Sequence, residues 1–191
     1  MNKARWEEIM AVAARLFREK GYRATTMDDI AAELNVTKPA LYYYIDNKHD
    51  LLYAICESAT ERLMEGAKRI MDEPGSVEEK LRRLIRWHVN MFSAHGDVFA
   101  VYLAEEGELP PEKRSFIRGL SREYESYYRR LLEEGIREGR FREVDVPMAV
   151  RAISGMCNWL SVWFHPDGKY NADEIAEIFF DLFLQGCRKK D

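Results

Sequence analysis

Residues 25–52 read TTMDDIAAELNVTKPALYYYIDNKHDLL, and this stretch decides the fold of the chain. Thr26 is followed three residues later by Asp29, a pairing that caps the beginning of a helix. Apolar side chains then recur at helical spacing up to Leu34. Asn35 comes next, and asparagine tolerates the left-handed backbone conformation that ends many helices. The stretch therefore begins with a short amphipathic helix followed by a tight turn.

A second short helix is predicted directly after this turn. Thr37 is its N-cap, and Pro39 falls in the first helical turn, where a missing N–H group costs nothing. Leu41 would anchor the helix to the core, but the three tyrosines that follow cannot all be buried on so short a helix. Two short helices joined in this way form a helix-turn-helix, whose second helix enters the major groove of DNA.

The predicted DNA-binding residues lie on and around this second helix. Those expected to form the recognition element are Thr37, Lys38, Pro39, Ala40, Tyr42, Tyr43 and Tyr44. Thr26 and Lys48 are expected to hold phosphates, and Arg23 and Lys3 are further basic residues that could join them. Phosphate contacts fix the position of a protein on DNA, whereas contacts to base edges select the sequence. The expected partner is a palindromic, double-stranded operator.

These motifs resemble the tetracycline-repressor (TetR) family of bacterial transcription regulators. The similarity runs from Trp6 to Leu52 through ARLFREKGY, TTMDDIAAELNV, TKPALYYYI and NKHDLL, in the order and spacing of the family. Asn35 departs from the glycine that many members carry, which changes the turn little. The resemblance implies a helix-turn-helix DNA-binding domain at residues 1–47 and a ligand-binding and dimerisation domain at residues 48–191. The competing interpretation is a generic helical bundle.

Caps and chain breaks predict an all-α fold of nine helices, three in the N-terminal domain and six after it. The first helix ends at Gly21, and the fourth runs from Lys48 to about residue 72. The later helices are expected to begin at about residues 76, 97, 112, 145 and 171, with the eighth reaching about Phe164 and the last about Arg188. No segment of the sequence has a convincing strand pattern.

Composition restricts the function further. The 191 residues carry a net charge of −4, and residues 1–52 are neutral, so the acidic excess lies in the remainder. Three widely spaced cysteines favour free thiols in a reducing cytoplasm, and the four histidines show no metal-ligand spacing. The apolar stretch 152–164 is shorter than the ~20 residues that span a bilayer. We expect a soluble, cytoplasmic protein without metal, cofactor or membrane association.

No catalytic residues are expected. The sequence lacks a GxxxxGK[ST] phosphate loop, a GxGxxG motif and a GxSxG nucleophile motif. The rival class is a helical enzyme or carrier with an unrecognised site. Specific binding to a palindromic probe supports the regulator, whereas turnover without DNA binding supports the rival.

Aromatic and polar side chains of the fifth to eighth helices suggest an apolar pocket with a few polar groups. The candidate pocket residues are Trp87, His88, Met91, Phe92, Phe99, Tyr102, Tyr124, Tyr128, Asn158, Trp159 and Trp163. Ordinary core packing is the alternative for each of them. For His88, a hydrogen-bonded core histidine is as consistent with the pattern as a residue that contacts a ligand.

The segment 155–186, GMCNWLSVWFHPDGKYNADEIAEIFFDLFLQG, resembles a TetR subgroup that senses acyl-coenzyme A thioesters. Val162 departs from the basic residue that many of its members carry at this position. The resemblance implies a fatty acyl-coenzyme A as the ligand that releases DNA, and a planar aromatic drug or metabolite is the alternative. Candidate basic residues at the pocket rim are Arg86, Arg118, Arg122 and Arg129.

The last helix is apolar over most of its circumference, so it must bury both sides. We expect it to pair with the eighth helix in a four-helix bundle between two chains. Candidate interface residues are Phe179, Phe180, Phe183 and Leu184. The alternative is a helix that is buried entirely within its own chain. Neither the operator sequence nor the choice between repressor and activator follows from these patterns.

Overall fold

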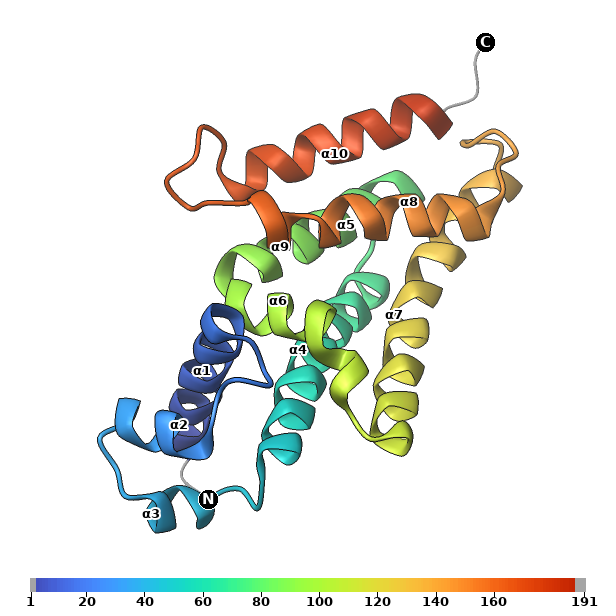
Figure 1. Cartoon of the computed structure of the whole chain (residues 1–191). Helices are drawn as coiled ribbons and strands as arrows, with labels where there is room; N and C mark the ends of the chain where they lie inside the picture. Colours follow the sequence, from blue (N-terminus) through green and yellow to red (C-terminus); the bar gives the residue numbers. More distant parts are fainter. Residues whose placement is uncertain (1–2, 188–191) are drawn as a thin grey trace. The chain divides into compact units, whose positions relative to one another are not determined.

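The computed structural model describes residues 3–187, except the side chain of Lys3. Its regular structure is helical throughout this range (Figure 1). The helices are α1 (Lys3–Lys20), α2 (Met27–Glu33), α3 (Lys38–Tyr42), α4 (Lys48–Asp72), α5 (Val77–Ala94), α6 (Gly96–Glu105), the 3₁₀ turn η1 (Glu106–Glu108), α7 (Pro111–Arg137), α8 (Val146–Asn158), α9 (Leu160–Trp163) and α10 (Ala172–Cys187). The all-α prediction is confirmed.

The chain forms two compact units. The first contains the described residues up to Ala59 together with His95–Arg118, and the second contains Thr60–Ala94 together with the described residues from Gly119 onward. Helices α4 and α7 each begin in the first unit and continue without a break into the second. The functional boundary that was predicted after residue 47 stays a prediction.

Local capping builds the first unit as the sequence predicts. The Thr26 hydroxyl accepts a hydrogen bond from the Asp29 N–H at 3.1 Å, and the Asp29 carboxylate accepts one from the Thr26 N–H at 2.8 Å. Asn35 has a φ of 54°, the left-handed conformation expected at the turn. The Thr37 hydroxyl accepts from the Ala40 N–H at 3.4 Å and caps α3. The core of this unit includes Ile9, Ala13, Phe17, Ile30, Leu41, Leu51, Leu52 and Ile55.

In the second unit, α5 packs against both α8 and α10. The beginnings of these helices are also fixed locally, because Asp145 caps α8 and the pair Asn171 and Glu174 caps α10. The core of this unit includes Leu81, Leu84, Ile85, Val89, Leu131, Ile153, Ile175 and Phe180. The end predicted for the last helix, at Arg188, lies outside the described residues.

The predicted eighth helix is divided at Trp159 into α8 and α9 and ends at Trp163, one residue before the predicted end. The Ser161 hydroxyl donates to the Asn158 carbonyl at 2.8 Å, and the Val162 N–H donates to the Trp159 carbonyl three residues back at 3.0 Å. Such back-bonding by serine and tightened backbone bonds bend helices. The nine predicted helices are thus present in residues 3–187, with the eighth in two pieces.

Candidate DNA-binding surface and ligand-binding unit

Helix α3 exposes the side chains that were predicted to read DNA. Leu41 is the one buried residue among the five of α3 and anchors the helix to the core. Tyr43 is 83% exposed and Tyr42 is 40% exposed, whereas Tyr44 is half-buried beside the Tyr43 ring. Also exposed are Thr37, Lys38, Pro39 and Ala40. The structure therefore exposes six of the seven predicted recognition residues on α3 and its two caps, whereas Tyr44 follows the helix and is half-buried.

Two of the predicted contact residues are engaged within the unit. The Lys38 ammonium lies 2.8 Å from an Asp28 carboxylate oxygen, and this hydrogen-bonded partner raises the pKa of Lys38. The Thr26 hydroxyl donates to the Asp29 carboxylate at 2.5 Å while it caps α2. Both side chains are exposed at the surface, and a phosphate would compete with an acidic partner for each of them.

Lys48 has a different environment from the one expected for a phosphate contact. Its ammonium donates to the backbone carbonyls of Tyr22, Arg23 and Thr25 at 2.9, 3.3 and 2.8 Å, and it lies 4.5 Å from the centre of the Tyr22 ring. An ammonium has three N–H donors, and all three have acceptors here. The phosphate contact predicted for Lys48 stays a prediction, and the structure adds a second role for this side chain. It ties the beginning of α4 to the segment between α1 and α2.

Replacing Lys48 with methionine should lower the Tm by about 5 °C, because three hydrogen bonds from a charged donor are lost. It should leave unchanged the salt dependence of whatever DNA binding remains. Lys68→Met changes an exposed lysine of the same helix and serves as the control. If Lys48→Met instead lowers the magnitude of the slope of log binding constant against log salt concentration by about one and leaves the Tm unchanged, Lys48 contacts a phosphate.

Acidic side chains of α6 and of the 3₁₀ turn η1 also hold the segment between α1 and α2, within the first unit. The Arg23 guanidinium pairs with the Glu108 carboxylate at 2.9 Å, and the Tyr22 N–H donates to the Glu105 carboxylate at 3.4 Å. Sequence patterns did not predict these contacts because the partners are more than 80 residues apart. Arg23, a predicted member of the basic cluster, is thus already paired with an acidic side chain.

A buried polar cluster lies between α5, α7 and α8 of the second unit. His88 Nδ1 is 3.3 Å from the Tyr128 hydroxyl, and His88 Nε2 is 3.2 Å from Asn158 Oδ1. The Tyr128 hydroxyl also lies 3.4 Å from that of Tyr124. Burial lowers the pKa of His88 to about 4, partly offset by its hydrogen bond to Asn158, so the ring is neutral at pH 7. We call His88, Tyr124, Tyr128 and Asn158 the polar cluster. Phe92 packs beside it, and the centres of the Phe92 and His88 rings are 5.5 Å apart.

The other predicted pocket residues do not join this cluster. Trp87 packs on α4, where its ring lies over Gly66 and its Nε1 donates to the Leu63 carbonyl at 3.2 Å. Trp159 is 62% exposed and Trp163 is 42% exposed, because the helical rotation that turns Asn158 inward turns Trp159 outward. Met91 is half-buried on α5, and Phe99 and Tyr102 lie on α6 in the first unit. A place for these residues in a ligand site stays a prediction.

A groove with a volume of about 480 Å³ lies between α4 and α7 in the second unit. It is lined by Glu61, Met64, Glu65, Lys68, Leu120 and Glu123. We call it the α4–α7 groove. Leu120 lies one helical turn before Tyr124 and on the same face of α7. Three carboxylates and one ammonium make its rim acidic.

Two of the four predicted rim arginines already have acidic partners. Arg86 pairs with Glu177 at 2.5 Å, and Arg118 pairs with Glu106 at 2.7 Å. Arg122 and Arg129 are exposed on α7, and no carboxylate of the described residues lies within salt-bridge distance of either. These two remain available for an anionic ligand.

Helices α8 and α9, with Trp159 between them, present an apolar stripe to solvent. Its members recur at intervals of four, three, four and three residues, and they are Met148, Ala152, Gly155, Trp159 and Val162. Met148 is 56% exposed and Val162 is 60% exposed. Sequence reasoning missed this stripe, although its helical spacing was readable. We call it the outer stripe.

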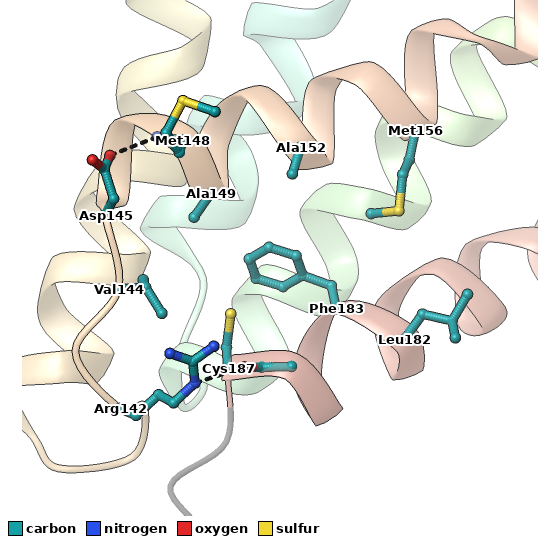
Figure 2. A pocket seen from close by; sticks show the side chains of 11 residues that line it. Arg142, Val144, Asp145, Met148, Ala149, Ala152, Met156, Leu182, Phe183 and Cys187 are labelled. Atoms are coloured by element: carbon teal, nitrogen blue, oxygen red, sulfur yellow. Dashed lines mark hydrogen bonds between the residues drawn. The ribbon is translucent and has the colours of Figure 1, made fainter.

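Helix α10 adds to the outer stripe across a groove of about 570 Å³ (Figure 2). Leu182 is 61% exposed and Ile178 is 41% exposed, whereas Phe180 and Phe183 are buried within their own chain. Phe183 lines the groove, and Phe179 and Leu184 are half-buried. The outward apolar residues of α10 therefore differ from those predicted, because a helix that is apolar all round does not reveal by periodicity which side faces its own core.

The patterns on the helix-turn-helix and on the C-terminal helices match known family models. The model described as "Bacterial regulatory proteins, tetR family" matches residues 9–55, and "Tetracyclin repressor-like, C-terminal domain" matches residues 74–187, more than half of the chain. The chain belongs to the TetR family. It is a transcriptional regulator by this membership, and the recognition made from the N-terminal motifs is confirmed.

Relatives within the TetR family extend over nearly the whole chain. The HTH-type transcriptional repressor KstR2 of Rhodococcus jostii is 28% identical over 97% of this chain and 92% of the relative. The regulator PfmR of Thermus thermophilus is 37% identical with a TM-score of 0.87, covering 93% of this chain and 97% of PfmR. AibR, solved in complex with isovaleryl coenzyme A and operator DNA, is 29% identical with a TM-score of 0.84 and covers the same shares.

None of the described helices is long and apolar enough to cross a membrane. Among residues 3–187, no group of three or more histidine, cysteine or acidic side chains is arranged to hold a metal ion.

Proposed function

We propose that this TetR-family protein is a homodimeric repressor that binds a palindromic operator through α3 and leaves it when an acyl-coenzyme A thioester binds in the second unit. The observation that carries the DNA part is the capped, solvent-facing helix α3, with Tyr43 almost fully exposed. The relatives named as repressors and the AibR complex, which holds both a coenzyme A thioester and operator DNA, support the ligand part.

The recognition role of α3 predicts a sequence-specific defect. Tyr43→Ala should weaken operator binding by about 5- to 150-fold, the cost of one good base contact, and should change binding to random DNA little. Fluorescence anisotropy with operator and random duplexes at fixed salt measures both. Tyr170→Ala, which removes a tyrosine that is 43% exposed in the second unit, is the matched control. An equal loss on both duplexes would show that Tyr43 does not select sequence.

The dimer part rests on the outer stripe and on two glycines. Gly155 and Gly186 lie within α8 and α10, and apart from the backbone of its own helix a Cβ at either position would meet no atom of residues 3–187 within 4 Å. A glycine in a helix costs about 1 kcal/mol relative to alanine, and nothing within the chain requires one here. Close approach by a helix of a second copy explains both. Two copies related by a two-fold axis would present two α3 helices about one DNA turn apart, ~34–36 Å.

The predicted interface residues take different places in this proposal. Ile178 and Leu182 make the contact on α10, and Phe179 and Leu184 border it. Phe180 and Phe183 support the helix from behind, since both are buried in their own chain.

The acyl part predicts an effect of chain length. Each additional buried methylene is favoured by roughly 0.8 kcal/mol, so the thioester concentration that releases half of the operator should fall about fourfold per methylene until the site is filled. Titration of the protein–operator complex with saturated acyl-coenzyme A thioesters of increasing length measures this. Free coenzyme A is the control. Failure of every chain length to release DNA would remove the acyl-coenzyme A assignment.

A second candidate inducer is a planar aromatic compound without negative charge. One observation favours it: the acidic rim of the α4–α7 groove, with Glu61, Glu65 and Glu123, repels phosphates. Release of operator by such a compound, together with no release by thioesters, would select this candidate and leave the repressor assignment intact.

Release of DNA requires that the ligand bind one conformation of the protein better than another. Helix α4 begins at Lys48, which is fixed to the segment after α1, and it continues into the second unit. We propose that α4 carries the change from the ligand to the helix-turn-helix.

A further inference from the structure

The polar cluster is costly to bury in an otherwise apolar interior. His88 is 2% exposed, Tyr124 is 4% exposed and Tyr128 is fully buried. The neighbouring side chains on α5 and α8, such as Leu84 and Ile153, are apolar. Burial of a polar group is unfavourable unless it is hydrogen-bonded, and an apolar core would satisfy the packing equally well. The cluster is therefore a candidate for polar recognition.

The hydrogen bonds of the cluster are all long. The four distances that involve His88 and Tyr128 lie between 3.2 and 3.4 Å, whereas strong bonds of these kinds are nearer 2.8 to 3.0 Å. Ser154, one helical turn before Asn158 on α8, has a buried hydroxyl without a partner among the described residues. The cluster is loosely joined, and an unsatisfied hydroxyl lies one helical turn from it on α8.

The polar cluster and Ser154 leave some hydrogen-bond donors without an acceptor among the described residues. A neutral histidine has one donor and one acceptor. With Asn158 Oδ1 as acceptor, His88 Nε2 donates and Nδ1 accepts from the Tyr128 hydroxyl. The Leu84 carbonyl, the other acceptor at 3.3 Å from that hydroxyl, keeps its backbone N–H partner within α5. The Asn158 side-chain nitrogen donates to no other described residue, and neither does the Ser154 hydroxyl. The groups left over are donors, and their complement is an acceptor oxygen.

Building on the proposed function, we propose that Asn158 and Ser154 donate hydrogen bonds to an oxygen atom of the inducer, which is a carbonyl or hydroxyl oxygen buried in the second unit. His88 and Tyr128 hold the Asn158 amide in position for this contact. The oxygen belongs either to the thioester carbonyl or to a ketone or hydroxyl further along the acyl group. A plain hydrocarbon chain would leave both donors unpaired.

Three pairs of probes distinguish the possible origins of this oxygen atom. Binding of each probe to the full chain is measured by calorimetry without DNA. The first pair is an acyl-coenzyme A and the S-alkyl-coenzyme A of equal length, which lacks the carbonyl. The second pair is an acyl-coenzyme A with a terminal ketone and its unsubstituted form. The third pair is a neutral aromatic ketone and its methylene analogue, which tests the contact without coenzyme A.

The wild-type protein should prefer the oxygen-bearing member of at least one pair by about tenfold, the effect of one buried hydrogen bond that is lost. Ser154→Ala and Asn158→Leu should each reduce this preference toward equality. Ser154→Ala removes an unpaired hydroxyl, so it should fold like the wild type. Ser126→Ala, which removes a hydroxyl bonded to the Glu123 carbonyl on α7, should keep the preference.

Equal binding within all three pairs, no binding by any probe, or an unchanged preference in both variants overturns the proposal. The operator-release titration tests the proposed function separately. If no thioester or aromatic compound releases the operator, the proposed function fails.

Discussion

Leu182→Asp should convert the protein into a monomer at micromolar concentration and weaken operator binding about 100-fold or more. Leu182 is 61% exposed on α10, so the folded chain tolerates a carboxylate there. In the proposed dimer the same carboxylate would be buried against the outer stripe of the partner without a counter-charge. Loss of the dimer removes the gain from binding two half-sites together, which is typically 10²- to 10⁴-fold.

The control for this variant is Leu103→Asp, which changes another exposed leucine, on α6 in the first unit. It should remain a dimer with wild-type affinity. Gly155→Arg gives an independent test, because space is open around Gly155 in one chain and would be closed in the dimer. Light scattering and operator titration measure both properties. If Leu182→Asp and Gly155→Arg both stay dimeric, the interface lies elsewhere.

The wild-type protein should lose about 3 kcal/mol of unfolding free energy between pH 7 and pH 4 through His88 alone. Burial lowers the pKa of this histidine from 6.5 to about 4, so the unfolded chain binds a proton that the folded chain excludes. Stability therefore falls as the pH drops below 6.5 and stops falling from this source below about 4.

His88→Gln isolates this contribution, because glutamine is polar and does not titrate. The variant is expected to be less stable than the wild type at pH 7, since the bonds to Tyr128 and Asn158 are altered. Its loss of stability from pH 7 to pH 4 should nevertheless be about 3 kcal/mol smaller. Urea unfolding at fixed protein concentration across this range measures the difference. Parallel pH profiles would mean that folding does not change the pKa of His88.

Helix beginnings were predictable because their signals are local. The pairs Thr26–Asp29 and Asn171–Glu174 each lie within one helical turn, and both form the expected caps. The role of Lys48 was not predictable in this way. Its three acceptors lie 23 to 26 residues earlier, and only the packed unit brings them to the ammonium.

The second unit shows the same distinction. The sequence pattern put His88 and Asn158 on the inward faces of their helices, where the structure has them, and it left open whether His88 was a core residue. Trp159 was predicted for the same pocket as Asn158, but it is 62% exposed because consecutive helical residues point about 100° apart; its place in a ligand site stays a prediction. In the proposed dimer, a second copy would cover the exposed side chains of Trp159 and Leu182.

Selection of random double-stranded DNA by the purified protein, followed by sequencing, tests the central assignment most directly. The proposed dimeric regulator predicts an enriched inverted repeat whose half-site centres lie about one helical turn, ~10 base pairs, or a multiple of it apart. The same selection with Tyr43→Ala should lose the enrichment, and Tyr170→Ala should keep it. Recovery of a pool without any repeated motif from the wild-type protein would contradict the account.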